Sequence, residues 1–551
     1  MKNFYLKPKF FSTIKNYSKE QFVKDAVAGI IVAIIALPLS IALALASGVE
    51  PACGIYTAIA AGFFVSFLGG SRVQIAGPTA AFASIVAGIV ATQGMDGLLI
   101  ATILAGIMLI LMGVFKLGSL IKFIPNTITV GFTAGIAVTI LVGQIKDFLG
   151  LTYAAGIKPV ETFEKIEANI EAIGTFSWQA LVVGIVSLAI LVFYPKFEKR
   201  VPPSLIAVIV GALMVKFIPG LDEGVFTIGD LYTIPTGLPR LAISGIEISF
   251  EKISAVLPSA FTIAILAAIE SLLSCVVADS MVNSKHNSNA ELVGQGVANI
   301  ASVLFGGIPA TGAIARTAAN AKNGGRTPVA GMVHSVVLVL VLLFLMPYAA
   351  LIPMPTIAAI LFVVAYNMSE WRKFASIVKS APKSDIVVMV VTFILTVVFD
   401  LVIAIEVGMV LAAMLFMKRM SDKTEVSGWK YSEDDNDSIE LKTVPKNVRV
   451  YEVTGPLFFG SADKILDIKF KEYTTCLILR MRSVNALDAT AMNALDTLMK
   501  KCEKKGVCLI LSHVNEQPLS VMKKSGFFDK VGADNFCNHI DEALELAAKK
   551  I

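Results

Sequence analysis

The amino-acid sequence predicts an α-helical polytopic membrane protein that ends in a small α/β domain. The 551 residues are 56% hydrophobic and 16% charged, with a mean hydropathy of +0.75, whereas soluble proteins carry about a quarter charged residues. Apolar runs follow one another from Lys24 to about Arg419. From about Ser421 onward the composition is that of an ordinary soluble domain. A membrane domain followed by a soluble domain is therefore expected.

Composition divides the chain into four parts. Residues 1–22 are Lys-rich and aromatic but lack the pattern of a cleaved signal peptide, so we expect a cytoplasmic segment. Residues 23–420 form the membrane domain, 421–445 a linker and 446–551 the soluble domain. Four of the six cysteines fall in the soluble domain, without metal or disulfide spacing. A reducing cytoplasm is expected around it.

Fourteen apolar segments follow one another in the membrane domain. Two of them, Pro309 to Ala321 and Thr356 to Asn367, are too short to cross a bilayer at ~1.5 Å per residue. The fourteen segments begin near Val23, Ala52, Val73, Leu98, Thr127, Ser177, Pro203, Ala255, Glu291, Pro309, Thr327, Thr356, Asp385 and Leu401.

Basic residues orient these segments. If the N-terminus is inside, the cytoplasmic turns contain Lys and Arg, such as Arg72, Lys196 and Lys285, while the long outer connections contain acids such as Glu161 and Asp222. Both termini are then cytoplasmic, and we expect a multi-pass protein of the cytoplasmic (inner) membrane. The net charge of +5 follows from this topology and is too small to indicate nucleic-acid binding.

The fourteen segments divide into seven plus seven. An odd number of spans gives two halves of opposite orientation, as in many secondary transporters. Pro78 lies 54 residues after Lys24, and Pro309 lies 53 residues after Val256. Each proline opens the third segment of its half. We expect inverted repeats at about residues 23–218 and 255–420.

Two proline-containing interruptions predict an anion site. Proline at the first helical position starts a helix, and a helix that starts inside the membrane directs its positive end at what lies before it. Small residues allow an anion to approach backbone N–H groups, and the two threonine hydroxyls donate to the anion or cap the helix. The predicted anion contacts are Gly77, Pro78, Thr79, Ala80, Ala310, Thr311, Gly312 and Ala313.

Ionisable residues inside apolar segments are the next candidates, because a charge at the bilayer centre costs ~2.5–3.5 kcal/mol. Glu270 is the predicted coupling group for H⁺ or Na⁺, with Ser274 one turn away to share the ligand. Its alternative role is a buried structural hydrogen bond. Arg316 is expected to supply a fixed positive potential at the anion site, or else to snorkel to the cytoplasmic end. Glu406 is expected to serve packing.

The soluble part alternates strands and helices. Strands are predicted at Asn447–Val453, Thr475–Met481 and Val507–Ser512, and helices at Thr490–Lys504 and near Pro518–Lys524. The sequence shows no Gly-rich phosphate loop, catalytic triad or metal cluster. An enzyme is not expected, and no cofactor beyond a coupling ion is expected.

Three stretches resemble the sulfate permease (SulP) family of anion transporters: Ala76–Ala81, Ala268–Leu273 and Pro309–Thr317. The C-terminal part resembles a STAS domain. The resemblance implies inverted repeats with core and gate parts, elevator-type alternating access and a homodimer in the lipid bilayer. The STAS domain offers a surface for a cytoplasmic regulatory protein. Residues 285–296 look closest to the bacterial branch that includes the C4-dicarboxylate transporter DauA.

Details within the family bear on coupling. Its cyanobacterial bicarbonate transporters carry Asp and Thr where this chain has Glu270 and Ser274, and use Na⁺, whereas Glu is similar to members regarded as H⁺-coupled. Many members have Gln after the proline, whereas here Leu39 follows Pro38, and Ser40 is expected to be the polar group that faces the anion site. The loop Leu487–Ala491 of the soluble domain has Ala where anti-sigma-factor antagonists have a phosphorylated Ser, so phosphoregulation of that type is not expected.

The sequence therefore predicts an H⁺-coupled secondary transporter of a small anion: sulfate, bicarbonate or a C4-dicarboxylate. A Na⁺-coupled bicarbonate transporter and an uncoupled anion exchanger or channel are the alternatives. A nucleobase transporter shares the architecture but normally lacks the STAS domain. The helix ends discriminate charge better than shape, so the sequence leaves the anion open.

Overall fold

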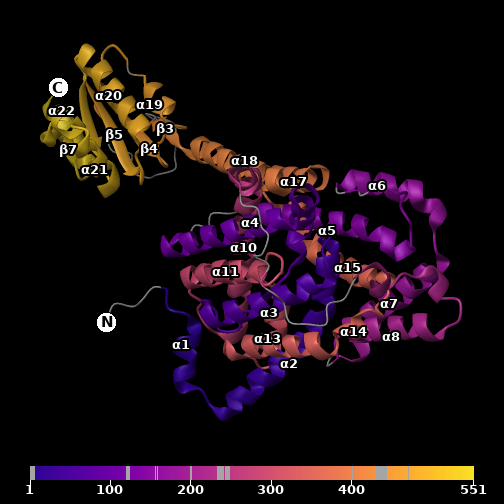
Figure 1. The fold of residues 1–551 in the computed structure, drawn as a ribbon. Helices are drawn as coiled ribbons and strands as arrows, with labels where there is room; N and C mark the ends of the chain where they lie inside the picture. Colours follow the sequence, from indigo (N-terminus) through magenta and orange to yellow (C-terminus); the bar gives the residue numbers. More distant parts are fainter. Residues whose placement is uncertain are drawn as a thin grey trace. The chain divides into compact units, whose positions relative to one another are not determined.

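The structure is a computed structural model of the chain (Figure 1). It divides into two compact units, Met1–Met409 and Val410–Ile551. The first unit is almost entirely helical, and the second contains a five-stranded sheet. The described residues are 6–119, 125–155, 157, 159, 161–198, 201–232, 241, 249–399, 401–429, 444–469 and 471–550.

Helices occupy most of residues 9–231, which include the predicted first repeat, and a short strand and several 3₁₀ turns lie between them. The main elements are α1 (Lys9–Thr13), α2 (Lys19–Ala46), α3 (Pro51–Leu68), β1 (Ala76–Gly77), η2 (Ala80–Phe82), α4 (Ala83–Val114), α5 (Asn126–Leu149), α6 (Thr162–Glu171), α7 (Trp178–Phe197), α8 (Pro203–Phe217) and α9 (Ile228–Leu231).

The predicted second repeat has a comparable series. Its elements are α10 (Phe250–Val282), α11 (Ser288–Leu304), β2 (Thr311–Gly312), α12 (Ile314–Lys322), α13 (Val329–Phe344), α14 (Met346–Ala349), α15 (Met354–Met368), α16 (Trp371–Ser380), α17 (Lys383–Val398) and α18 (Leu401–Lys423).

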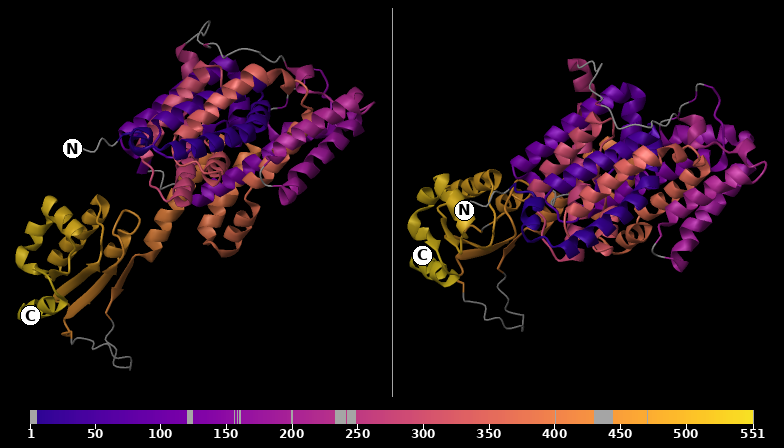
Figure 2. Two further views of the ribbon diagram at one scale, coloured as in Figure 1. Left: turned by 90° about the horizontal axis from the view of Figure 1, so that it is seen from below. Right: turned by 60° about the horizontal axis from the view of Figure 1, so that its bottom comes forward.

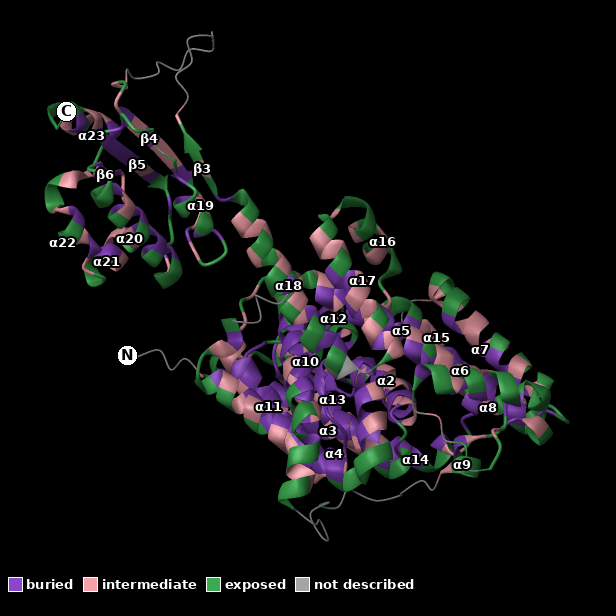
Figure 3. Ribbon diagram, turned by 90° about the horizontal axis from the view of Figure 1, so that it is seen from above, coloured by how far each residue is buried: buried purple, intermediate pink, exposed green. Residues whose placement is uncertain are grey.

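Many of these helices are long and apolar enough to cross a membrane. Within the described residues, six helices of at least 18 residues meet that criterion, and two shorter apolar helices, α8 and α13, accompany them. Burial differs sharply among the long ones: 67% of the most apolar stretch of α10 is buried, against 28% for α7 (Figure 3). Exposed Ile185, Phe193 and Phe197 on α7 thus form a surface suited to lipid.

The fourteen predicted segments all contain helix, but two of them join. α4 runs from Ala83 to Val114 and contains a break at Gly94, where φ is 69° and ψ is −172°. This left-handed backbone suits glycine, and it lies between the segments predicted to begin near Val73 and Leu98. The number of membrane spans stays a prediction.

The helices of the first unit pack in two groups, and α7 and α8, drawn in magenta, lie along one edge of this unit in both views of Figure 2. In one group, α2, α3, α4, α10, α11, α12 and α13 pack with one another, and this group holds β1 against α3 and β2 against α10 and α11. In the other, α5 packs with α15 and α17, and α7 packs with α8 and α15. Close packing in the first group relies on glycine: a Cβ on Gly296 of α11 would lie 2.4 Å from the carbonyl oxygen of Gly106 in α4.

The two proline-containing interruptions meet as a short antiparallel ladder. Ala76 of β1 pairs with Gly312 of β2, and Gly77 pairs with Thr311. The prediction that the prolines occupy the first helical positions is wrong. Pro78 precedes η2, and Pro309 lies in extended backbone before β2, with α12 beginning only at Ile314. The two interrupted stretches pair with each other before each becomes helical. This pairing satisfies backbone N–H and C=O groups that lipid could not satisfy.

The second unit is an α/β domain around a sheet of order β3-β4-β5-β6-β7, in which β4 to β7 are parallel and β3 is antiparallel to β4. β3 lies inside the predicted linker 421–445, of which residues 430–443 are outside the described part. The elements are β3 (Glu425–Gly428), β4 (Val448–Thr454), α19 (Asp463–Leu466), β5 (Cys476–Ser483), α20 (Ala489–Lys504), β6 (Cys508–Ser512), α21 (Glu516–Lys524), α22 (Phe527–Val531), β7 (Phe536–Cys537) and α23 (Ile540–Lys549).

Candidate functional site

Polar side chains hold the extended backbone before β2. The hydroxyl of Thr57 in α3 accepts a hydrogen bond from the N–H of Ile308 at 2.7 Å. The amide of Asn299 in α11 bonds both backbone groups of Ala310, at 2.8 and 2.9 Å. Ser302 donates to the carbonyl of Ile308 at 2.7 Å. This stretch of non-helical backbone is thus satisfied by its neighbours, as buried backbone inside a membrane must be.

A buried carboxylate holds the turn before β1. Glu291 of α11, fully buried, accepts hydrogen bonds from the N–H groups of Gly70 and Ser71 at 2.8 and 3.1 Å. It also accepts from the side chains of Gln74 and Gln295, at 2.8 and 3.3 Å. Four donors compensate the desolvation of this charge. The carboxylate therefore fixes the path of the chain into the ladder.

The strand β2 is fastened to α10 by hydroxyl groups. Thr311, fully buried, donates to the carbonyl of Ala267 at 3.1 Å and bonds the hydroxyl of Ser271 at 2.8 Å. The N–H of Gly312 donates to the same Ser271 oxygen at 3.1 Å. The predicted role of the Thr311 hydroxyl as an anion donor does not fit this geometry, because that hydroxyl is committed to α10.

The backbone donors also differ from those predicted. Ala310 donates to Asn299, Gly312 to Ser271, and Ala313 to the carbonyl of Ile75 at 2.9 Å. All three N–H groups therefore have partners within the protein. In the described part of the chain, no partner is found for the N–H groups of residues 314–316, the first turn of α12. The available donors lie one turn later than the sequence predicted.

Arg316 lies in that first turn of α12 and is 1% exposed. Its Nη2 donates to the hydroxyl of Ser40 at 3.1 Å and to the carbonyl of Pro78 at 3.4 Å. Its Nε and Nη1 have no hydrogen-bond partner within the described residues. The snorkelling alternative is excluded by this burial. The guanidinium bridges α2, the segment after β1, and α12.

Glycine is required at position 77 for this placement. A Cβ on Gly77 would lie 2.0 Å from Nη1 of Arg316 and 3.1 Å from its Cζ. The guanidinium thus rests directly on the backbone of β1. Gly77 contributes space for the arginine, in addition to its place in the ladder.

The charges at this point are unbalanced. A helix N-terminus carries about half a positive charge, and a cation in the first turn adds to it. Within the described residues, no carboxylate oxygen lies within 4.0 Å of Arg316. A buried, unpaired charge is strongly unfavourable. An anion between the first turn of α12 and the segment after β1 would supply the missing counter-charge.

Glu270 of α10 is partly exposed and accepts a hydrogen bond from the hydroxyl of Thr79 at 3.1 Å. Ser274, predicted to share a ligand with Glu270, donates instead to the hydroxyl of Thr317 at 3.3 Å. Thr79 therefore joins Glu270 to the segment that carries Pro78 and Ala80. Six of the predicted site residues lie together: Ser40, Gly77, Pro78, Thr79, Glu270 and Arg316. The other predicted residues make hydrogen bonds within the surrounding framework: Ser274, Ala310, Thr311, Gly312 and Ala313.

A cavity of about 610 Å³ lies between the two helix groups. Ser84 and Gly88 of α4 and Ser259 of α10 line one side, and Thr139 of α5 and Thr396 of α17 line the other. The α4 part of this lining begins two residues after Phe82, the end of η2. The cavity thus reaches the helix that follows the first interruption.

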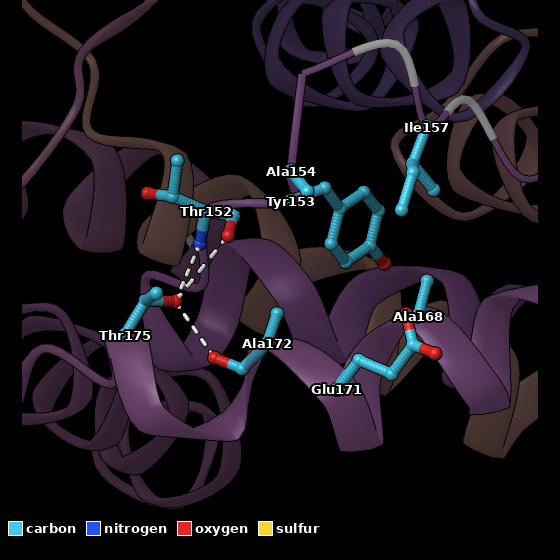
Figure 4. A pocket seen from close by; sticks show the side chains of 8 residues that line it. All are labelled: Thr152, Tyr153, Ala154, Ile157, Ala168, Glu171, Ala172 and Thr175. Carbon is cyan, nitrogen blue, oxygen red and sulfur yellow. Dashed lines mark hydrogen bonds between the residues drawn. The ribbon is translucent and has the colours of Figure 1, made fainter.

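A second, smaller pocket of about 220 Å³ lies elsewhere, on the predicted outer connection (Figure 4). There Thr175 accepts a hydrogen bond from the N–H of Thr152 at 2.9 Å and donates to the carbonyl of Ala172 at 2.7 Å. Tyr153 and Glu171 also line it. None of the predicted site residues lines this pocket, so we give it no part in the site.

Sequence reasoning missed the residues that support the ladder. Glu291, Gln295, Asn299 and Ser302 lie on α11 at intervals of four, four and three residues, which places them on one face. A polar stripe on a buried apolar helix was the signal that could have revealed them. Glu291 bonds the distant turn before β1, more than 200 residues away, whereas Asn299 and Ser302 bond the extended backbone before β2, 6 to 11 residues further along the chain.

Comparisons with known proteins agree with this architecture. The chain matches the Sulfate permease family over residues 22–392 and the STAS domain over residues 439–543. The chain belongs to the sulfate permease family. This family consists of transporters rather than enzymes, and the protein is a multi-pass membrane anion transporter with a C-terminal STAS domain.

Individual relatives span nearly the whole chain. The Bacillus subtilis protein named "Putative sulfate transporter YvdB" is 42% identical over 97% of this chain and 99% of its own length. The "Bicarbonate transporter BicA" of Picosynechococcus is 31% identical over 95% of this chain and 94% of its own length. The solved inward-facing structure of the murine Solute Carrier 26 family member A9 anion transporter shares the fold, with a TM-score of 0.88 at 18% identity, covering 98% of this chain and 94% of that one.

Proposed function

We propose that this protein is a secondary active transporter that carries sulfate or bicarbonate across the cytoplasmic membrane, coupled to H⁺ through Glu270. The unpaired, buried guanidinium of Arg316 is the observation that carries the proposal. Relatives named for sulfate and for bicarbonate transport support these two anions ahead of a C4-dicarboxylate. Arg316, the first turn of α12, Ser40 and the segment Gly77–Ala80 hold the anion.

The surroundings of Glu270 favour a proton over Na⁺. A cation site is built from several oxygen ligands directed at one point. Here the hydroxyls of Ser271 and Ser274 bond Thr311 and Thr317, and the Thr79 hydroxyl directs its hydrogen at the Glu270 carboxylate. A carboxylate with one hydroxyl donor suits protonation better than Na⁺ coordination. Na⁺-coupled transport of bicarbonate and uncoupled exchange are the competing functions.

Movement of one helix group against the other would expose the site to each side in turn. The first group carries Arg316, Glu270 and the ladder, and the cavity of about 610 Å³ separates part of it from α5 and α17. This division supports elevator-type alternating access, with the first group as the moving core and the second as the gate. The proposal includes a homodimer with both termini in the cytoplasm and a regulatory protein bound to the STAS domain.

Uptake into liposomes tests the function and its coupling. Purified full-length protein is reconstituted, and uptake of radiolabelled sulfate, bicarbonate and fumarate is measured with an imposed pH gradient (acid outside), an inward Na⁺ gradient, or neither. We expect accumulation of sulfate or bicarbonate that is driven by the pH gradient. Glu270→Gln should abolish that accumulation and retain part of the exchange of labelled against unlabelled anion.

Glu406→Gln is the matched control, because Glu406 is an exposed carboxylate on α18, whereas Glu270 is the carboxylate that Thr79 contacts. It should accumulate anion as wild type does. Uptake driven by Na⁺ alone contradicts proton coupling. Unchanged accumulation by Glu270→Gln removes this residue from the mechanism, and preferred uptake of fumarate overturns the proposed substrates.

A further inference from the structure

A pair of cysteines in the second unit lies beside a lysine, on the sheet face that α23 covers. Cys476 of β5 and Cys508 of β6 are direct partners in the parallel register of the two strands. Partners in register point to the same face of a sheet. Both side chains contribute to the apolar cluster under α23, which includes Ile540, Ala543 and Ala547. The two thiols are therefore neighbours within one small region.

The end of α23 brings a cation to this pair. Lys550, the residue that follows α23, places its Nζ 3.7 Å from the Sγ of Cys508 and hydrogen-bonds the side-chain oxygen of Asn535. Asn535 in turn lies 4.0 Å from the Cys508 sulfur. Lys550 is exposed, Cys508 is partly exposed, and Cys476 is fully buried. A small reagent can thus reach Cys508 from solvent, whereas Cys476 is reached through Cys508.

These neighbours favour the thiolate of Cys508. A hydrogen bond from the Cys476 thiol and the nearby Lys550 ammonium lower the pKa of Cys508 below its ordinary value, against the opposing effect of burial. The same contact and burial raise the pKa of Cys476, so that it remains a thiol. The thiolate is the nucleophilic form of cysteine. One residue of the pair is ready to react, and the other holds a proton beside it.

We propose that Cys508 is a redox-sensitive cysteine. Hydroperoxides oxidise its thiolate to a sulfenic acid, and Cys476 then attacks this sulfenic acid to form a Cys476–Cys508 disulfide. The proposal concerns the soluble domain and does not depend on which anion is transported. Adjacent strands lie ~4.8 Å apart, within the Cα separation of ~4.4–6.8 Å that a disulfide bridges. Because cytosolic disulfides are commonly transient and redox-sensing, the modification marks the redox state of the cytoplasm.

The chemistry balances in two steps. In the first, the Cys508 thiolate attacks the terminal oxygen of the hydroperoxide: an S–O bond forms, the O–O bond breaks, and the departing alkoxide or hydroxide takes a proton from Lys550. The sulfur loses two electrons and the peroxide gains them. In the second, the Cys476 sulfur attacks the Cys508 sulfenic acid: the S–S bond forms, the S–O bond breaks, and the hydroxide leaves as water with the Cys476 proton. Lys550 regains its proton from solvent.

Peptide mass spectrometry of the full-length protein in detergent tests the reactivity. The rate of alkylation by iodoacetamide at neutral pH is measured for each cysteine, with Cys537 as the internal reference. Cys537 is also partly exposed and lies in the same sheet, but burial raises its pKa. We expect Cys508 to react at least about tenfold faster than Cys537. Equal rates for the two cysteines overturn the proposal.

Matched variants distinguish a specific effect of Lys550 on Cys508 from a general effect of a substitution at the end of α23. Lys550→Met should slow alkylation of Cys508 by about fivefold or more, whereas Lys549→Met, which changes the preceding lysine at the end of α23, should leave the rate unchanged. An equal change in both variants, or no change in Lys550→Met, refutes the role of Lys550.

Oxidation is tested by brief treatment with hydrogen peroxide in the presence of dimedone, which traps sulfenic acids. Wild type should yield a Cys476–Cys508 cross-linked peptide that dithiothreitol removes. Cys476→Ser should yield the dimedone adduct of Cys508 instead. The cross-link in wild type needs no variant to fold, so its absence while other cysteines are oxidised contradicts the proposal directly.

Discussion

Gly77→Ala should weaken anion binding while leaving the fold intact. The added Cβ would lie 2.0 Å from Nη1 of Arg316, so the guanidinium must move away from β1. The side chain is long enough to move, but its bonds to Ser40 and Pro78, at 3.1 and 3.4 Å, would be strained or lost. The substitution is therefore expected to lower the affinity for the anion much more than it lowers the stability of the fold.

The size of the effect follows from the interaction that is displaced. A hydrogen bond to a charged group contributes about 1.5–3 kcal/mol, and each 1.4 kcal/mol is about tenfold in affinity. We expect KM for the transported anion to rise by about 10- to 100-fold in Gly77→Ala, with a small change in melting temperature. Initial rates of uptake into liposomes over a range of anion concentrations give KM.

Gly174→Ala is the control for the substitution itself. Gly174 lies in the turn that follows α6, and a Cβ there would meet nothing within 4 Å. This variant should keep the wild-type KM. An unchanged KM in Gly77→Ala, or an equal rise in Gly174→Ala, refutes the assignment of Gly77 as the residue that makes room for the guanidinium.

Two further predictions concern the supports of the site. Ser40→Ala removes the hydroxyl that accepts from the charged Arg316 and should raise KM for uptake by about tenfold or more, as expected for ~1.5–3 kcal/mol; a KM equal to that of wild type argues against this role of Ser40. Glu291→Gln replaces a carboxylate that accepts four hydrogen bonds and should lower the free energy of unfolding by about 1.5–3 kcal/mol. Thermal unfolding in detergent measures this loss, and an unchanged melting temperature contradicts the structural role of Glu291.

The helices and the soluble strands could be read from the sequence because their signals are local. Each of the fourteen apolar segments contains helix, and alternation located β4, β5 and β6 with small errors at their ends. β3 escaped detection because four residues in a polar stretch carry no clear period, and its identity as a strand depends on pairing with β4. The local sequence pattern therefore located the elements whose hydropathy or alternation is visible without knowledge of their partners.

The candidate site was predicted in part. Glu270, Arg316 and the two interruptions were found because charge, proline and small residues stand out in apolar surroundings. The ladder was not foreseen, because β1 and β2 have two residues each and pair across more than 200 positions of sequence. For the same reason the sequence predicts that the backbone N–H groups of Ala310 and Gly312 face the anion. In the structure these N–H groups donate to the side chains of Asn299 and Ser271.

The central claim is that the anion neutralises the buried guanidinium of Arg316. Equilibrium binding of the radiolabelled anion that wild type accumulates tests it most directly, comparing purified wild type with Arg316→Gln and Arg326→Gln. Arg326 is a matched control because its guanidinium bonds the carbonyls of Ala321 and Gly325. We predict at least about tenfold weaker binding for Arg316→Gln and wild-type binding for Arg326→Gln. Equal affinity of Arg316→Gln and wild type would contradict the account.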